Sequence, residues 1–198
     1  LESQLSGTSK EYYLDEIKAV IKKTTFTYIR QQQMLGLGHA ILTGEPLIGN
    51  EPFAVILADD LFDCIGDGVT SQLIEIYNKY QCSVIAIEEM PLTQVESYGV
   101  IYGDLIDDSN DTYRVTNMFE KPKSHDLIEF VEGRVNPNNA PSFMAIAGRY
   151  ILTPDIFDIL KKIKPGKNGE IQITDALLSQ AKKGKVIAYK FKGKRFDC

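Results

Sequence analysis

Residues 53–60 read Phe-Ala-Val-Ile-Leu-Ala-Asp-Asp, and this stretch decides the fold class of the chain. A continuous apolar run of this length is typical of a strand buried on both faces of a helix-covered sheet. The run ends abruptly at two adjacent carboxylates, Asp59 and Asp60. In open α/β sheets, ligands bind at the carboxyl ends of the strands, where a carboxylate can hold a divalent cation against a phosphate. A simple cap on the following turn or helix explains an aspartate here equally well.

Strand and helix patterns alternate around this run, as in βαβ units. A second apolar strand is expected at residues 82–87. Between the two runs, apolar side chains recur at the spacing of an amphipathic helix: Leu73, Ile76, Tyr77 and Tyr80. Further strands are expected at residues 25–30, 98–106, 113–120, 142–152 and 185–191, with a polar hairpin turn at residues 107–111. Because three of these strands follow one another without long helices, the sheet is expected to be mixed.

Further helices are expected at three places. One covers residues 12–22, one follows an N-cap at Thr153 and runs through Ile163, and one follows an N-cap at Thr174 and stops before Gly184. No internal repeat or low-complexity tract is visible. We therefore predict a single α/β domain over residues 1–198, with a mixed, mostly parallel central sheet.

The composition excludes several classes of protein. Hydrophobic residues make up 43% of the 198 residues and charged residues 25%, as in an ordinary globular protein. A net charge of −5 argues against a nucleic-acid polymer as partner but leaves small phosphate ligands open. We expect no membrane insertion, because no apolar stretch has the required length and no secretory leader pattern is present. The three cysteines, Cys64, Cys82 and Cys198, have neither disulfide-framework nor zinc spacing, so a reducing cytoplasm is the expected location.

Two glycines mark the first candidate ligand-contact segment. Residues 36–40 read Gly-Leu-Gly-His-Ala and follow Gln31. Glycines let the backbone approach a flat ligand closely, and a glutamine amide can read a base through its donor and acceptor groups. A turn at the start of a helix explains the same pattern. His39 has no obvious Ser, Cys or Asp partner in the sequence, which favours a hydrogen-bonded structural role.

Two charged clusters stand at predicted strand ends. In Glu120-Lys121-Pro122, Pro122 biases Lys121 toward an extended conformation. A carboxylate there can accept hydrogen bonds from sugar hydroxyls and an ammonium can neutralise a phosphate, while a solvated charge pair is the alternative interpretation. Residues 192–197, Lys-Gly-Lys-Arg-Phe-Asp, gather basic side chains that could face a phosphate, beside Asp197 as a second candidate metal ligand. A solvated terminal strand explains this cluster as well.

In their order along the chain, these motifs resemble the bacterial UTP:glucose-1-phosphate uridylyltransferases, a group of sugar-phosphate nucleotidyltransferases. The resemblance rests on Gln31 with residues 36–40, residues 51–59, Tyr98-Gly99-Val100, Glu120-Lys121-Pro122, Gly148-Arg149-Tyr150, residues 169–176 and residues 193–198. It covers nearly the whole chain. It implies a Rossmann-like nucleotidyltransferase fold and an enzyme that joins UTP and glucose 1-phosphate into UDP-glucose, releasing pyrophosphate.

The resemblance implies metal binding and catalysis for three residues. Asp59 and Asp197 match two magnesium-binding carboxylates, so Mg²⁺ is the expected cofactor. Lys121 matches the lysine that approaches the sugar phosphate, and Lys121 and Asp59 are the expected catalytic residues. A phosphate oxygen of glucose 1-phosphate would attack the α-phosphorus of UTP in line, so positioning and charge neutralisation replace a protein nucleophile.

The resemblance also implies substrate contacts and partners. The nucleotide-binding positions are Gln31, Gly36, Gly38 and Asp59. The sugar-binding positions are Gly99, Glu120 and Lys121. The expected partners are UTP, glucose 1-phosphate, UDP-glucose and further copies of the chain in a homo-oligomer.

The chain departs from the family pattern in two respects. The opening strand with its glycine-rich Gly-Thr-Arg loop, which wraps the triphosphate, and the C-terminal helical tail are not among these residues. A protein made only of these residues is therefore expected to bind triphosphate poorly. Phe143 stands where the family has Asn followed by Leu. The sequence leaves open a nucleotidyltransferase for another nucleotide or sugar phosphate, a UDP-sugar-dependent glycosyltransferase, and a non-catalytic nucleotide-binding domain.

Overall fold

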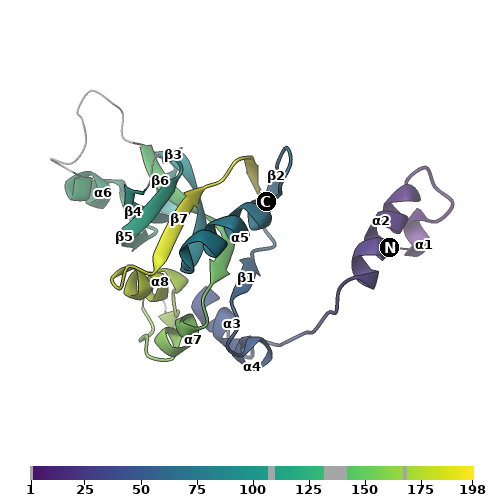
Figure 1. Ribbon diagram of the computed structural model, residues 1–198, viewed down its shortest axis with the longest axis horizontal. Helices are drawn as coiled ribbons and strands as arrows, with labels where there is room; N and C mark the ends of the chain where they lie inside the picture. The colour runs from purple at the N-terminus through teal and green to yellow at the C-terminus, as the bar shows by residue number, and fades with distance from the viewer. Residues whose placement is uncertain (1, 107–109, 132–141, 167–168) are drawn as a thin grey trace. The chain divides into compact units, whose positions relative to one another are not determined.

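The structure is a computed structural model that describes residues 2–106, 110–131, 142–166 and 169–198 (Figure 1). Its internal contacts divide the chain into two compact units, Leu1–Arg30 and Gln31–Cys198. The expectation of a single domain over residues 1–198 stays a prediction. No helix in the described part of the chain combines the length and the apolar character that crossing a membrane requires.

The first unit contains two helices, α1 (Glu2–Leu5) and α2 (Tyr12–Lys22). The predicted helix at residues 12–22 is confirmed, but only Leu14 of its apolar face is buried. An ion pair between Glu2 and Lys18 joins the two helices. The strand predicted at residues 25–30 is wrong, because this segment pairs with no described strand and an unpaired strand has no stable hydrogen-bonding partner.

The second unit contains a six-stranded sheet, a two-stranded sheet and six α-helices within its described residues. The helices are α3 (Leu37–Thr43), α4 (Glu45–Ile48), α5 (Val69–Tyr80), α6 (Ser124–Val131), α7 (Asp155–Leu160) and α8 (Ile173–Ala181), with a short 3-10 helix η1 (Val95–Ser97). The strands are β1 (Phe53–Ile56), β2 (Asp60–Asp63), β3 (Ser83–Pro91), β4 (Gly99–Leu105), β5 (Thr112–Glu120), β6 (Ser142–Leu152), β7 (Val186–Lys190) and β8 (Lys194–Asp197). Part of the hairpin turn predicted at residues 107–111 lies outside the described residues.

The central sheet is mixed, as predicted, with the strand order β1-β6-β3-β7-β5-β4 and a further pairing between β6 and β4. Among the described strands, however, only β3 and β7 pair in parallel. The prediction of a mostly parallel sheet is therefore wrong. The reason is two antiparallel strands: β6, which runs antiparallel to β1, β3 and β4, and β5, which runs antiparallel to β4 and β7.

Helices cover both faces of this sheet (Figure 1). On β3, Val84 and Ala86 pack with Leu73 of α5, and the alternate residues Ile85 and Ile87 join the cluster that contains α7 and α8. This alternation follows from the period of two along a strand. The result is a three-layered α/β arrangement whose core lies on both sides of the sheet.

The strand predicted from the apolar run at residues 53–60 is shorter and more exposed than expected. β1 stands at one end of the strand order, and its residues alternate between half-buried and exposed, with Ile56 at 60% exposure. The expected burial on both faces is wrong, because the alternate residues Ala54 and Ile56 lie exposed on one face of β1. After β1 the chain turns through Asp59 and enters β2, which pairs with β8 in a separate two-stranded sheet.

Both predicted helix caps differ from the structure. Pro154, not Thr153, is the N-cap of α7, and the helix ends at Leu160 because lysines 161 and 162 continue only as a turn. Gln172, not Thr174, is the N-cap of α8. The hydroxyl of Thr174 instead donates a hydrogen bond to Glu120 at the end of β5.

Candidate active site

A pocket of about 300 Å³ lies beside the turn that joins β1 to β2, and it is also lined by the start of β4, the end of β5 and the start of α8. Five of the residues expected from the sequence line it: Asp59, Gly99, Glu120, Lys121 and Asp197. The fold thus brings the candidate metal carboxylates and the candidate sugar-phosphate residues to one place. Phe143 is not among the lining residues; its ring is buried in a separate apolar cluster with Val95, Val100 and Leu127.

The remaining predicted residues, Gln31, Gly36 and Gly38, do not line this pocket. The Gln31 side-chain nitrogen lies 2.9 Å from Nδ1 of His39 and donates to the Gly36 carbonyl at 3.2 Å. The structural role expected for His39 is therefore confirmed as a hydrogen-bonded one. Leu37, the residue between the two glycines, does line the pocket.

The two glycines allow a close main-chain contact. A Cβ atom on Gly38 would lie only 2.6 Å from the carbonyl oxygen of Ile171, to which the Gly38 N–H donates at 2.9 Å. Gly36 has a φ of +86°, a region that side chains other than glycine rarely adopt. These observations support the helix-start interpretation of the motif, and its contact with a base stays a prediction.

The end of β5 forms the side of the pocket that holds Glu120 and Lys121, the residues expected to contact a sugar phosphate. Glu120 accepts a hydrogen bond from the hydroxyl of Thr174 at 2.9 Å, so α8 orients this carboxylate. Gly99 is closely packed in this corner, because a Cβ atom there would lie 2.9 Å from Cδ1 of Ile146. Thr174 was not recognised as a site residue in the sequence, where its hydroxyl reads as a helix cap.

Lys121 differs from its expected conformation. Its φ of +44° lies in the left-handed region, so the extended conformation predicted from Pro122 is wrong. Its backbone N–H donates to the carbonyl of Tyr98 at 3.1 Å, and this bond holds the turn by which the chain leaves β5. A non-glycine residue in this region carries local strain, which is often found at functional sites.

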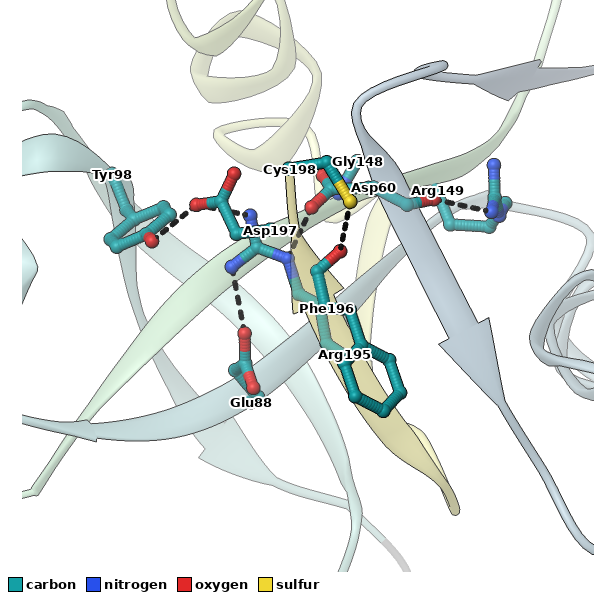
Figure 2. A network of polar contacts seen from close by, with 9 residues as sticks. All are labelled: Asp60, Glu88, Tyr98, Gly148, Arg149, Arg195, Phe196, Asp197 and Cys198. Carbon is teal, nitrogen blue, oxygen red and sulfur yellow. Dashed lines mark hydrogen bonds and ion pairs between the residues drawn. The ribbon is translucent and has the colours of Figure 1, made fainter.

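Arg195 and three carboxylates form a polar network beside the pocket, and Arg149 joins it by donating to the Asp60 carbonyl at 3.1 Å (Figure 2). Asp60 is only 5% exposed and accepts hydrogen bonds from the Gly148 N–H at 2.7 Å and from Nε of Arg195. Nη1 of Arg195 donates to Glu88 at 2.8 Å, and Nη2 lies 3.5 Å from Oδ2 of Asp197. Burial alone lowers the pKa of Arg195, but its hydrogen bonds to Asp60 and Glu88 outweigh this and raise the pKa above its usual value.

The predicted role of the terminal basic cluster in facing a phosphate does not hold for Arg195, because its guanidinium is engaged by carboxylates of the protein. Lys192 lies 3.9 Å from Asp111, and Lys194 lies over the ring of Phe196; neither lysine lines the pocket. The two-residue period of a strand could have revealed this contact in the sequence, because Arg195 and Asp197 are two residues apart and share one face of β8.

The two candidate metal ligands are the more exposed carboxylates of this region. Asp59 is exposed to the pocket, and its backbone carbonyl accepts the Cys198 N–H at 3.0 Å, which ties the β1–β2 turn to the end of β8. Asp197 accepts a hydrogen bond of 2.5 Å from the hydroxyl of Tyr98. This hydrogen bond is the main reason that the pKa of Tyr98 is raised, with burial adding to the effect.

The donor set fits a magnesium ion that arrives with a phosphate ligand. The described residues hold no group of three or more His, Cys, Asp or Glu side chains that could form a metal cage. Asp59 and Asp197 instead supply two carboxylates to the same pocket. Mg²⁺ is commonly bound by one or two carboxylates, with waters and substrate phosphates completing its octahedron.

Tyr150 is a further pocket residue that sequence reasoning placed in a motif without a role. It is 4% exposed, lines the pocket from β6, and its pKa is raised by burial and by nearby carboxylates, first Glu120 and then Asp60. No side-chain hydrogen bond of its hydroxyl is found among the described residues.

Comparisons with known proteins show the family to which the chain belongs. Residues 5–196 match the profile of the family described as nucleotidyl transferase. The chain belongs to the nucleotidyl transferase family. It is 55% identical to a UTP–glucose-1-phosphate uridylyltransferase of Pseudomonas aeruginosa, in an alignment that covers 100% of this chain and 66% of the relative. It is 38% identical to a protein of the same name from Staphylococcus epidermidis, covering 100% of this chain and 63% of the relative. The chain thus spans slightly less than two thirds of these curated relatives.

Solved structures show the same nucleotidyltransferase fold. An apo UDP-glucose pyrophosphorylase matches with a TM-score of 0.84 and 55% identity, covering 100% of this chain and 67% of the other. A UDP-glucose pyrophosphorylase complexed with UDP-glucose matches with a TM-score of 0.84 and 53% identity, covering 98% and 68%. A UTP-bound enzyme of Acinetobacter baumannii matches with a TM-score of 0.73 and 30% identity, covering 100% and 64%. The predicted family and fold are confirmed.

Proposed function

We propose that this nucleotidyl transferase moves a uridylyl group from UTP to glucose 1-phosphate, giving UDP-glucose and pyrophosphate. The observation that carries the proposal is the pocket where Asp59 and Asp197 meet Glu120 and Lys121. The names of the relatives support the same reaction, and the solved structures include one complexed with UDP-glucose and one bound to UTP.

In the proposed reaction, Asp59 and Asp197 hold Mg²⁺ with the phosphates of UTP. The ion, when bound, neutralises charge on these phosphates. Lys121 neutralises the phosphate of glucose 1-phosphate and keeps one of its oxygens in line with the α-phosphorus of UTP. That oxygen forms the new P–O bond and the bond to the leaving pyrophosphate breaks, so no protein nucleophile is required.

Substrate selection is assigned to two regions of the second unit. Glu120, oriented by Thr174, accepts hydrogen bonds from sugar hydroxyls, and Gly99, which also lines the pocket, lets the main chain approach the sugar. The proposed uracil-reading region consists of Gln31, Gly36 and Gly38. It borders the pocket through Leu37, which lies between the two glycines and lines the pocket. The side-chain nitrogen of Gln31 is engaged by His39 and the Gly36 carbonyl, so its amide oxygen is the atom we propose to accept a hydrogen bond from the base.

The remaining expectations belong to the same proposal. Residues 1–198 form one nucleotidyltransferase domain, the protein forms a homo-oligomer, and it acts in the cytoplasm. A reducing location is supported by the three cysteines Cys64, Cys82 and Cys198, which are all free.

The test is to measure pyrophosphate release by the intact gene product with UTP and Mg²⁺, with and without glucose 1-phosphate. Release that requires the sugar phosphate and yields UDP-glucose supports the proposal. A panel of other nucleotides and sugar phosphates measures its strictness. Folded protein that releases no pyrophosphate, or that instead releases UDP from UDP-glucose in the presence of an acceptor, contradicts it.

A further inference from the structure

We infer that Arg195 is a positioning residue that sets the spacing of the two metal-binding carboxylates. The inference rests on the proposed function, because it takes Asp59 and Asp197 as the ligands of the divalent cation. Arg195 lines the pocket, but its side chain is only 6% exposed and its guanidinium is directed at carboxylates of the protein, which favours a positioning role over a substrate contact (Figure 2).

The guanidinium joins three parts of the fold. Nε donates to Asp60 at the start of β2, Nη1 donates to Glu88 of β3 at 2.8 Å, and Nη2 lies 3.5 Å from Asp197 of β8. Its central carbon also lies 4.7 Å from the centre of the Tyr98 ring, whose hydroxyl is bonded to Asp197. One side chain thus connects the small β2–β8 sheet to the central sheet.

Electrostatics explains why this connection is needed. The register of β2 and β8 places Asp60 directly opposite Asp197, and like charges in such a pair repel each other. Arg195 precedes Asp197 by two residues, so it lies on the same face and contacts both carboxylates. Without its charge, this repulsion would act on the end of β8, which is also the segment tied to the Asp59 carbonyl through the Cys198 N–H.

The geometry of the guanidinium is as important as its charge. A planar fork can bond two carboxylates in fixed directions, whereas a lysine ammonium is a single point charge on a flexible chain. Lysine at this position would therefore keep the charge but could not hold Asp60 and Glu88 at once. Loss of a residue that orients metal ligands usually weakens metal binding by about 10- to 100-fold.

The experiment titrates Mn²⁺, without nucleotide, into the intact gene product and reads free Mn²⁺ by electron paramagnetic resonance. The variants are Arg195→Lys, Arg195→Met and Glu88→Gln. The last variant leaves Arg195 in place but removes the charge of one of its partners. Arg114→Met is the matched control, because Arg114 is a partly buried arginine of β5 that donates to the Gly184 carbonyl at 2.6 Å and does not line the pocket. Asp59→Asn tests the metal site itself.

We expect Arg195→Lys to weaken Mn²⁺ binding about 10- to 100-fold, and Glu88→Gln to weaken it less, while Arg114→Met binds Mn²⁺ as the parent does. Parent-like Mn²⁺ binding by Arg195→Lys, together with weakened binding by Asp59→Asn, overturns the inference and leaves the metal assignment standing. If Asp59→Asn also binds like the parent, the metal assignment fails and the inference fails with it. If the Arg195 variants do not melt cooperatively, Glu88→Gln decides: parent-like binding overturns the inference.

Discussion

Asp60 and Asp197 lie directly opposite each other in the antiparallel register of β2 and β8, yet their surroundings differ sharply. Asp60 is 5% exposed and bonded to Arg195 and the Gly148 N–H, whereas the side chain of Asp197 is 49% exposed and borders the pocket. One carboxylate of the pair is therefore engaged inside the protein, and the other is open to the pocket where we propose that the metal ion binds. The same division separates Asp59 from its neighbour Asp60, and it leads to different predictions for the two adjacent aspartates.

Replacing Asp59 by Asn should remove catalysis with little effect on stability. Asp59 is exposed to the pocket, so its charge is available to a metal ion and is not needed inside the protein. We expect the kcat for pyrophosphate release to fall by about 100-fold or more, as when a group that stabilises developing charge is lost. Asp63→Asn, at the exposed end of β2, is the control. A near-parental rate for Asp59→Asn would rule out this residue as a metal ligand.

Replacing Asp60 by Asn should have the opposite pattern, with a large loss of stability. The change removes a buried negative charge from Arg195, and breaking a buried ion pair usually costs about 3 kcal/mol or more. Because Glu88 remains bonded to Arg195, we expect the free energy of unfolding to fall by about 3 kcal/mol, the lower end of that range. Urea denaturation measures this loss, with Asp63→Asn as the exposed comparison. Equal stabilities of the two variants would show that the Asp60–Arg195 pair does not support the fold.

The sequence predicted local elements better than the way they assemble. The strand at residues 142–152 was predicted with its observed bounds, because its long run of apolar and aromatic residues is a local signal. Its position between β1 and β3 was missed, since partner choice in a sheet depends on residues far away in the chain. The low burial of β1 was missed for the same reason, because a hydrophobic run does not reveal which of its faces will be covered by other elements.

The candidate site shows the same division. Asp59, Glu120, Lys121 and Asp197 could be named from motifs, and they do converge on one pocket. Their supporting residues could not be found in this way. Arg195 reads as part of a solvent-facing basic cluster until the fold buries it. The Thr174 hydroxyl reads as a helix cap until α8 and β5 are brought together.

Gly38→Ala should destabilise the protein, because the glycine motif is packed against the main chain of Ile171. The new methyl group would lie 2.6 Å from that carbonyl oxygen and 2.9 Å from Cδ2 of Leu160. Overpacking of this kind typically costs about 1 to 3 kcal/mol, so we expect a lower melting temperature. Gly166→Ala is the control, since a Cβ atom there has no contact closer than 3.8 Å and φ lies outside the left-handed region. If Gly38→Ala melts like Gly166→Ala, the close packing described for Gly38 is not a constraint.

Tyr150→Phe should affect ligand binding without weakening the fold. The hydroxyl lines the pocket and has no partner among the described residues, so its removal breaks no bond within that part of the protein. We expect the free energy of unfolding to stay within about 0.5 kcal/mol of the parent. The KM for a substrate should rise about five-fold, the value of one hydrogen bond of about 1 kcal/mol.

The control for this change is Tyr189→Phe, a buried tyrosine of β7 that does not line the pocket. Steady-state kinetics with each substrate varied in turn shows which ligand uses the Tyr150 hydroxyl. Unchanged KM values for both substrates would mean that this hydroxyl does not bind either of them.

Thr174→Val should selectively weaken the binding of the sugar phosphate. Valine has nearly the shape of threonine but cannot donate the 2.9 Å hydrogen bond that orients Glu120. If this hydrogen bond contributes about 1 kcal/mol to the binding free energy of glucose 1-phosphate, its loss raises the KM for glucose 1-phosphate about five-fold and leaves the KM for UTP unchanged. Thr174→Ser keeps the hydroxyl and should restore the parental KM, because the lost methyl group does not take part in the bond.

The pair of variants separates orientation from packing. The Thr174 methyl group lies near the position that a Cβ atom on Gly99 would occupy, at 3.2 Å, so a packing role would be lost in Thr174→Ser and kept in Thr174→Val. The hydrogen bond shows the reverse dependence. A higher KM for glucose 1-phosphate in the serine variant, with a parental value in the valine variant, would therefore assign Thr174 to packing and leave Glu120 to be oriented by another contact.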